Sequence, residues 1–309
     1  MLRYQALTAA AATATYFLIV AGAVVRVTGS GLGCPDWPLC HGGFVPPPDV
    51  AAIIEYSHRF IAVADSLLIM VVVALTLTRR RNDIRLLAPG VVIPLLLAGQ
   101  IGLGAITVLY ELPPYVVLVH LAFAMAILGL LVWMSVQATD GVAGPPGGGY
   151  ARVAAVGMAA AFVLAMTGAL VRASGASWAC AGFPACNGEL APFGRNPLMD
   201  IQLVHRFTAY TVAGVLLVVM VKGWSRRVMF PGIDKALGGL GLSLAAQIAI
   251  GAAAVSTELP AVLRGLHVAG AAAVWSSSVA VLAVVLRRRV SPDPLVMTQR
   301  LLAQKATGL

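Results

Sequence analysis

Residues 100–120 read QIGLGAITVLYELPPYVVLVH, and residues 247–267 read QIAIGAAAVSTELPAVLRGLH. The two stretches share a Gln, a Gly, the Glu-Leu-Pro turn and the final His in the same register, 147 residues apart. An apolar run, a short turn and a second apolar run are typical of two consecutive helices. A repeat at this period predicts that the chain contains two copies of one structural unit.

The repeat extends outward to other rare residues, including four of the five histidines. His58 and His120 are 62 residues apart, as are His205 and His267, which lie 147 residues further on. Two histidines per copy in an apolar setting predict two versions of one cofactor site. Other residues that recur at an offset of 146 or 147 are Arg26 with Arg172, Cys34 with Cys180, Cys40 with Cys186, Arg59 with Arg206, and Glu111 with Glu258.

The composition predicts an integral membrane protein. Hydrophobic residues make up 60% of the chain and charged residues 11%, far below the charged share of about 25% in soluble domains. Apolar runs long enough to cross about 30 Å of hydrocarbon lie near 6–26, 56–78, 86–109, 115–137, 151–173, 198–222, 236–256 and 261–286. We therefore expect an all-α fold with eight transmembrane helices, four in each copy.

An even number of helices per copy gives both copies the same orientation in the membrane. The expected architecture is two tandem four-helix bundles, related by a pseudo-two-fold axis along the membrane normal. The expected units are an N-terminal repeat at 1–138, a linker at 139–150 that contains PPGGG, a C-terminal repeat at 151–290 and a tail at 291–309.

Basic residues predict the orientation, because Lys and Arg near helix ends stay on the cytoplasmic side. On one side of the eight-helix arrangement lie Arg3, Arg79, Arg80, Arg81, Arg85, Arg152, Lys222, Arg226, Arg227, Lys235, Arg287, Arg288, Arg289, Arg300 and Lys305. Both termini and the linker are therefore expected in the cytoplasm, and the first helix is expected to be a retained span. The net charge of +9 follows from this asymmetry and from contact with the lipid bilayer, so nucleic acid is not an expected partner.

The four cysteines form two CX5C pairs, CPDWPLC at 34–40 and CAGFPAC at 180–186, in the two long loops expected outside. The outer face of a plasma membrane is oxidising, and the prolines favour turns that bring the sulfurs together. We expect the disulfides Cys34–Cys40 and Cys180–Cys186. Four free thiols are the alternative, and a zinc site is disfavoured because neither loop supplies a second set of ligands.

The histidine placement favours haem. His58 and His205 lie near the outer ends of their helices, and His120 and His267 follow the Pro turn at the same end. Two imidazoles at matched depth in a four-helix bundle can bind both faces of a haem iron. Two imidazoles alone rarely satisfy zinc or copper. A histidine packed in the core and bonded to a backbone carbonyl is the other interpretation.

Four arginines lie at the outer side, against the positive-inside distribution. Arg59 and Arg206 directly follow a histidine, and Arg26 and Arg172 end their helices. A guanidinium pairs well with a carboxylate, so we expect at least two of them to bind haem propionates. Simple snorkelling to the interface is the alternative.

The two copies differ at two acidic positions. Glu55 lies one helical turn before His58, whereas the second copy has Gln202. A carboxylate can move a proton or stabilise a cation and an amide cannot, so the first copy is expected to carry the chemistry. A helix N-terminal carboxylate with no further role is the alternative. Asp65, opposite Val212, is a buried acid without an assigned role.

The segments GSGLGCPDWPLCHG at 29–42, IIEYSHRF at 53–60 and QIGLGAITV with ELPPYVVLVH at 100–120 resemble the haem A synthase family. The resemblance implies oxidation of the C8 methyl group of haem O, through an alcohol and a hydrated aldehyde, to the formyl group of haem A, which serves cytochrome c oxidase. It implies a bacterial cell membrane and these residue roles: Glu55 catalytic, His58 and His120 for the substrate haem, His205 and His267 for a haem b cofactor, and cysteine pairs at Cys34 with Cys40 and Cys180 with Cys186.

Haem O is the expected substrate, and the candidate partners are a haem O synthase, a quinol or ferredoxin-like electron donor, and a second copy of the chain. One rival function is a two-haem membrane cytochrome b that carries electrons without altering haem. That rival predicts equivalent halves, which the difference between Glu55 and Gln202 argues against. A haem transporter is the second rival, and it predicts binding without a change in mass.

Overall fold

The computed structural model describes residues 2–139 and 148–287, which contain eight long helices. They are α1 Leu2–Val27, α2 Val50–Arg79, α3 Ile84–Leu109, α4 Pro114–Gln137, α5 Gly148–Ala173, α6 Pro197–Trp224, α7 Ile233–Ser256 and α8 Ala261–Val285. All eight are long and apolar enough to cross a membrane, which confirms the expected all-α integral membrane fold. The expected tail and residues 140–147 of the expected linker lie outside the described residues, and α5 already begins at Gly148.

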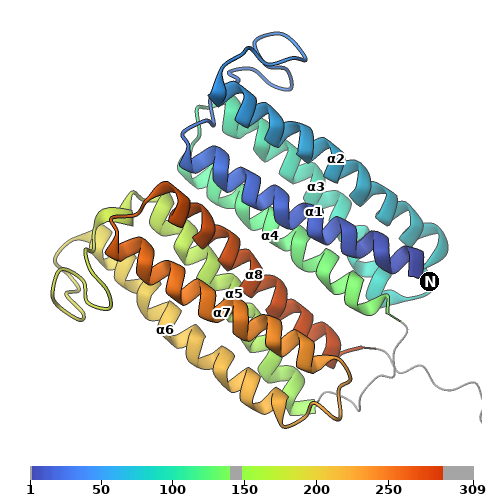
Figure 1. Ribbon diagram of the computed structural model, residues 1–309. Coiled ribbons are helices and arrows are strands. Elements are labelled where there is room, and N and C mark those ends of the chain that lie inside the picture. Colours follow the sequence, from blue (N-terminus) through green and yellow to red (C-terminus); the bar gives the residue numbers. More distant parts are fainter. Residues whose placement is uncertain (1, 140–147, 288–309) are drawn as a thin grey trace, which may run out of the picture.

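The helices form two groups of four (Figure 1). In the first group α1 packs on α2 and α4, and α3 packs on α2 and α4; in the second α5 packs on α6 and α8, and α7 packs on α6 and α8. The groups meet where α4 and α8 contact each other, α1 contacts α8 and α5 contacts α4. Each of these contacts has a counterpart under the repeat, which is the pattern expected for two tandem bundles.

Polar caps set the start of the two histidine-bearing helices that follow the long loops. Asp49 caps α2 by accepting the N–H of Ala52 at 2.9 Å, so this helix begins six residues before its expected apolar span. Asn196 caps α6 by accepting the N–H of Leu198 at 2.8 Å, and Pro197 occupies the first helical position. The capped turns hold Glu55 and Gln202 in regular helix, one turn before a histidine.

The Glu-Leu-Pro turns end α3 and α7 in the same way. Glu111 and Leu112 adopt left-handed backbone conformations, with φ of 57° and 62°, and Glu258 and Leu259 adopt 59° and 56°. The N–H of Leu112 donates to the carbonyl five residues earlier at 2.8 Å, and Leu259 does so at 2.7 Å. Such bonds satisfy carbonyls at a helix end, and they fix where the next helix, with its histidine, begins.

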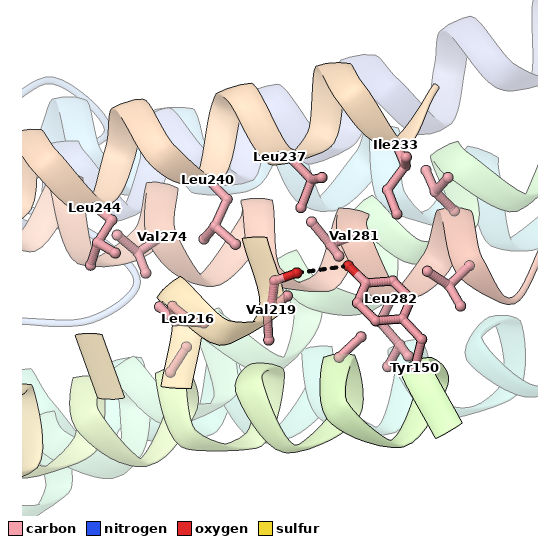
Figure 2. Packing of buried hydrophobic residues seen from close by; sticks show 14 of the residues in the cluster. Tyr150, Leu216, Val219, Ile233, Leu237, Leu240, Leu244, Val274, Val281 and Leu282 are labelled. Atoms are coloured by element: carbon pink, nitrogen blue, oxygen red, sulfur yellow. Dashed lines mark hydrogen bonds between the residues drawn. The ribbon is translucent and has the colours of Figure 1, made fainter. Parts of the chain in front are cut away.

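Aliphatic side chains fill the half of each bundle that lies away from the two long loops. In the second bundle Leu216, Leu240 and Val281 pack together, and the Tyr150 hydroxyl donates to the Val219 carbonyl at 3.1 Å (Figure 2). Between the bundles, the Trp275 ring packs directly on Gly129. A Cβ on Gly129 would lie only 2.6 Å from Cζ2 of Trp275. Small residues allow this close approach of helices in a lipid environment. The half of each bundle next to the long loops is the part left for a site.

Candidate functional site

The two long loops lie at the same end of the helices, opposite the N-terminus (Figure 1). Each contains a disulfide, Cys34–Cys40 and Cys180–Cys186, which confirms the expected pairing and uses all four cysteines. All four cysteine side chains are buried. The loops are therefore closed, compact caps over the histidine-bearing ends of the bundles.

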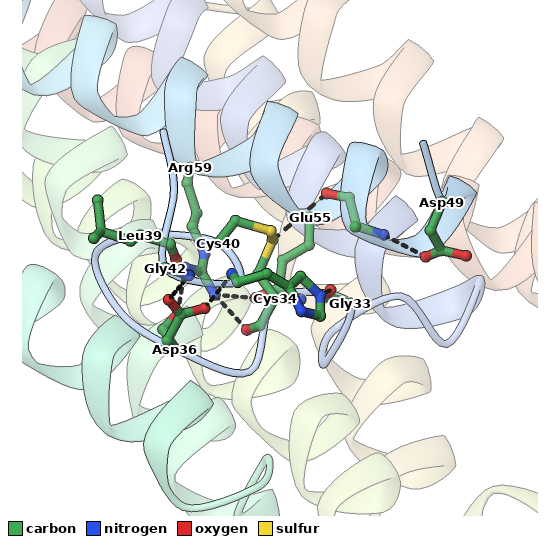
Figure 3. Close-up of a disulfide and its surroundings, with 11 residues drawn as sticks. Gly33, Cys34, Asp36, Leu39, Cys40, Gly42, Asp49, Glu55 and Arg59 are labelled. Carbon is green, nitrogen blue, oxygen red and sulfur yellow. Dashed lines mark hydrogen bonds and ion pairs between the residues drawn. A yellow bond between two sulfur atoms is a disulfide. The ribbon is translucent and has the colours of Figure 1, made fainter. Parts of the chain in front are cut away.

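The first loop lies directly on the start of α2. A Cβ on Gly33 would overlap the backbone of Ala51 and Ala52, so only glycine permits this approach. The backbone N–H of Cys34 donates to Oε2 of Glu55 at 2.9 Å (Figure 3). The disulfide loop and the candidate catalytic carboxylate thus form one structure.

Asp36 organises the same loop from its outer side. Its carboxylate accepts the N–H of Gly42 at 2.7 Å and that of His41 at 2.6 Å. These bonds, that of Gly42 first, stabilise the ionised form and hold the pKa of the Asp36 carboxyl below its ordinary value. The hydrogen bonds of Asp36 within the loop are therefore strongest when its carboxyl group is ionised.

Arg59 joins Glu55 to three loop carbonyls. Its Nη2 donates to Oε1 of Glu55 at 2.5 Å and to the carbonyl of Cys34 at 2.9 Å. Its Nη1 donates to the carbonyls of Asp36 and Leu39, both at 2.7 Å (Figure 3). These bonds involve both terminal nitrogens of Arg59, and the expected pairing of Arg59 with a propionate stays a prediction.

Arg206 repeats this arrangement without the carboxylate. Its Nη1 donates to the carbonyl of Ala185 at 2.8 Å, and its Nη2 donates to that of Cys180 at 3.2 Å. Gln202, the counterpart of Glu55, is 6% exposed, and its Oε1 accepts no hydrogen bond within the described parts of the chain. The two halves share the loop-holding arginine and differ in the charge beneath it.

The histidines of the first half pack against glycines on neighbouring helices. A Cβ on Gly22 of α1 would stand 3.2 Å from Cε1 of His58, and one on Gly104 of α3 would stand 3.4 Å from Cε1 of His120. Nε2 of His120 also lies 3.2 Å from Nε2 of Gln100. α2 and α4, which carry the two histidines, both pack on α1 and α3. The first bundle therefore directs both histidines toward helices that α2 and α4 share.

The second half repeats these contacts. A Cβ on Gly168 or Gly251 would stand 3.0 Å from Cε1 of His205 or His267, respectively. Nε2 of His267 lies 3.3 Å from Nε2 of Gln247. Every one of these partners is the counterpart of a residue in the first half, so the repeat conserves the walls of the site as well as the histidines.

A cavity of about 390 Å³ in the second half has both His205 and His267 in its wall. Most of its other walls are apolar, which is usual for cofactor sites. They come from all four helices of the second bundle, with Ala161, Leu164, Ala209, Ala213, Leu244, Ile248, Val255, Val268 and Val274 among them. Helices of the first bundle complete it, with Ala23 and Val27 of α1 and Pro114, Leu118, Leu121 and Met125 of α4.

Four arginines line this cavity: Arg26, Arg172, Arg206 and Arg264. Arg264 was absent from the expected set, and its Nε is buried without a hydrogen-bond partner in the described residues. The sequence did contain a signal, because Arg264 lies one turn before His267 where the first half has Val117. Cations from both halves thus gather at the second cavity.

The donor set fits a haem better than a bare metal ion. Nδ1 of His58, His120 and His267 is buried and lacks a hydrogen-bond partner within the described residues. Buried polar atoms normally have a hydrogen-bond partner, so each of these imidazoles has a ring nitrogen free to bind a ligand. Within residues 2–139 and 148–287, no three His, Cys, Asp or Glu side chains group to hold a metal ion by themselves.

His205 has a side-chain contact that would orient its ring for holding a haem. Its Nδ1 lies 3.0 Å from Oγ1 of Thr167, which leaves Nε2 for another partner. Such a second contact fixes the tautomer and the ring plane of a ligating histidine. The first half has Ala21 at the position of Thr167, so His58 lacks this support.

Comparison with known proteins identifies relatives of this chain. A family model described as COX15-CtaA, cytochrome oxidase assembly protein, matches residues 5–52 and 48–279. The chain is 34% identical to the heme A synthase of Symbiobacterium thermophilum, over 75% of this chain and 78% of that one. It is 30% identical to the heme A synthase of Alkalihalophilus pseudofirmus, over 68% of this chain and 72% of that one. This chain, whose described residues include eight helices long and apolar enough to cross a membrane, belongs to the COX15-CtaA family.

Proposed function

We propose that this chain is a haem A synthase, which oxidises the C8 methyl group of haem O to the formyl group of haem A. The observation that carries the proposal is the unequal pair of sites. Both halves have two histidines, glycine walls, a glutamine and a loop-holding arginine, whereas only the first has a buried carboxylate one turn before a histidine. An electron carrier needs no such difference between its halves.

In the first half, His58 and His120 would hold haem O from opposite sides of the bundle. Glu55 lies on the same helix as His58, three residues earlier, and therefore faces the same space. It is 3% exposed, and each of its oxygens already accepts one hydrogen bond. A carboxylate oxygen has a second lone pair, so Oε1 and Oε2 can each still take a proton released from the substrate.

The partners of Glu55 hold it in place. Arg59 and the N–H of Cys34 both donate hydrogen bonds to the Glu55 carboxyl group, which lies within a largely apolar bundle. A fixed negative charge stabilises positive charge that develops on the substrate as its methyl group is oxidised. The disulfide loop would act by keeping both partners in place.

In the second half, His205 and His267 would hold haem b, which supplies one-electron transfer when bound. Thr167 orients the ring of His205, and the cavity excludes water by its apolar walls. Arg26, Arg172 and Arg264 would pair with the propionates, because a guanidinium binds a carboxylate with two parallel hydrogen bonds. We keep Arg59 and Arg206 for the loops.

The proposed location is the bacterial plasma membrane, with the disulfide loops outside and both termini in the cytoplasm. The support is that Lys and Arg concentrate at the end of the bundle opposite the disulfide loops, and such residues stay on the cytoplasmic side. Single cysteines introduced at Arg80 and at Val45 test it with an impermeant thiol reagent. Labelling of the first from outside intact cells contradicts the proposed orientation.

The function is tested by mass spectrometry of haems extracted after co-expression with a haem O synthase. We expect wild-type protein to yield haem A, with haem b bound at the same time. Two haems of one type without any haem A, at full occupancy, identify the cytochrome b rival. Uptake and release of haem of unchanged mass identify a transporter.

A further inference from the structure

One buried acid has no part in the chemistry described so far. Asp65 is 4% exposed and lies in the interior of α2. Its Oδ2 accepts a hydrogen bond from Oγ1 of Thr15 at 2.9 Å, and its Oδ1 is buried with no partner among the described residues. Acids within a membrane span are costly and rarely serve packing alone.

Asp65 faces the same space as His58. The two residues are seven apart, which is two helical turns, or about 10 Å along the axis on one face of α2. The neighbouring helix shows the same register, because Gly22 faces His58 and Thr15, seven residues earlier, bonds to Asp65. Asp65 therefore lies directly below His58, on the side away from the disulfide loop.

Below Asp65 the bundle is closed. Ile69, one turn further along α2, belongs to a buried cluster with Ala11, Leu97, Ile127 and Leu131. Asp65 and Thr15 thus lie between the histidines of the first half and the apolar core. We call this pair the floor of the proposed first site.

The second site has an apolar floor at the same level. The counterparts of Asp65 and Thr15 are Val212 and Ala161, both buried in the aliphatic cluster of the second bundle. Ala161 also lines the cavity that contains His205 and His267. The fold therefore does not require the acid, and the floors differ where the two proposed haems differ.

We propose that Asp65, oriented by Thr15, recognises the alcohol hydroxyl that haem O carries on its long alkyl side chain. This inference rests on the proposed function and names how the first site selects its substrate. Haem O has a hydroxyl on the carbon next to the ring, whereas haem b has a vinyl group there. That edge of the porphyrin is opposite the propionates, so a haem O whose propionates lie toward the disulfide-loop end of the bundle turns this edge toward Asp65 and Thr15.

A hydroxyl suits Asp65 in either protonation state. It donates to an ionised Oδ1 and accepts from a protonated one, so the unpartnered oxygen is satisfied in both cases. The valine and alanine of the second floor match a vinyl group instead. The first site thus prefers the hydroxylated haem, and the second has no polar group that would favour it.

The test uses purified protein with resident haem b and two oxidised probes, haem O and haem O dehydrated at that carbon. Binding is followed by optical titration without reductant, so no turnover occurs. We expect the wild type to bind haem O about fivefold to a hundredfold more tightly than the dehydrated probe, as one buried hydrogen bond allows. Asp65→Val should remove this preference and leave the affinity for the dehydrated probe unchanged.

Two further variants keep the test decisive if Asp65→Val is poorly folded. Asp65→Asn should retain the preference, because an amide still bonds a hydroxyl, and Thr15→Ala should reduce it. Resident haem b content reports folding in each case. Equal binding of both probes by the wild type overturns the inference. A preference for haem O that persists in Asp65→Val also overturns it. If that preference persists and Asp65→Asn makes no haem A, Asp65 serves proton transfer instead.

The wild-type conversion assay separates this inference from the function on which it rests. Haem A formation without a preference between the probes rejects hydroxyl recognition and leaves the synthase proposal intact. A preference that disappears in Asp65→Val, in a protein that makes no haem A, supports the recognition site and rejects the proposed reaction.

Discussion

Arg59 lies one turn after Glu55 on α2, and its Nη2 donates to Oε1 of that carboxylate at 2.5 Å. The same guanidinium binds the carbonyls of Cys34, Asp36 and Leu39, so a single side chain connects the disulfide loop to the acid. The position of Glu55 therefore depends on the closed loop as well as on its helix. Arg206 makes the corresponding loop contacts over a neutral Gln202.

Glu55→Gln should fold and retain haem b, because Gln202 occupies the equivalent place in the second half. Haem A formation should fall by about a hundred- to ten-thousand-fold, the usual loss when an acid–base group is removed. Haem A per bound haem b, measured by mass spectrometry, checks this. The matched control is Gln202→Glu, which should keep haem A formation. A near-normal yield from Glu55→Gln reduces the residue to a helix-end carboxylate.

Arg59→Lys should loosen the first loop without emptying the second site. Lysine keeps the charge but lacks the planar fork that reaches three carbonyls and Glu55. We expect reduction of Cys34–Cys40 by a small thiol to become about tenfold faster, as the loss of a charge-assisted hydrogen bond implies. Arg206→Lys is the control and should affect Cys180–Cys186 alone. Unchanged reduction of both disulfides shows that the arginine contacts do not hold the loops.

The histidine pairs should be separable by substitution. His205→Ala or His267→Ala should remove the resident haem b, because each takes away an axial ligand and part of the cavity wall. His58→Ala or His120→Ala should retain haem b and abolish haem A formation. Pyridine haemochrome spectra and extracted haems measure the two effects. Loss of haem b from the first-half variants with haem O turnover preserved means that the halves are assigned the wrong way round.

Arg264→Val introduces the residue of the first half, Val117, into the second site. Since Arg264 lines the cavity with an unpartnered Nε, we expect it to pair with a propionate, and its loss should speed haem b release about tenfold. Transfer of haem b to an apoprotein acceptor measures the rate. Arg152→Ala is the control, because Arg152 lies near the start of α5, at the end of the bundle opposite the disulfide loops. Equal release from the wild type and Arg264→Val excludes this pairing.

The first loop should loosen only in acid. Because the pKa of Asp36 is lowered on folding, its contribution is fully present above the ordinary aspartate pKa and is lost as the pH falls through the lower folded value. Between pH 5 and 8 the loop should be unaffected. Loosening should begin only below the ordinary aspartate pKa of about 4. Amide hydrogen exchange at Gly42 measures this. Asp36→Asn should show faster exchange at Gly42 throughout, and a wild-type loop that opens near pH 6 contradicts the assignment.

The sequence predicted much of the fold because the determining features recur within it. Eight apolar spans, two CX5C loops and two His pairs were visible as repeated residue types at one offset. Helix starts were less accurate, since the cap at Asp49 extends α2 outside its apolar span. Caps are polar residues near the membrane surface, where hydropathy has no signal.

The site was harder to predict where main-chain atoms or helix packing decide it. The hydrogen bonds of Arg59 to loop carbonyls were not expected, because no residue pattern reveals a main-chain partner. Arg264 was missed because it has no counterpart in the first half. Which helices wall the second cavity depends on how the bundles meet, and periodicity gives no information about that contact.

The second cavity is walled partly by the first bundle, through Arg26 and Val27 of α1 and Leu118 and Leu121 of α4. A fragment with only α5–α8 would contain both histidines but leave that side of its cavity open to lipid. A chain with a single repeat would face the same problem and would need another copy of itself as the missing wall. Because both repeats belong to one chain, that wall is a contact within one molecule and not an association between two.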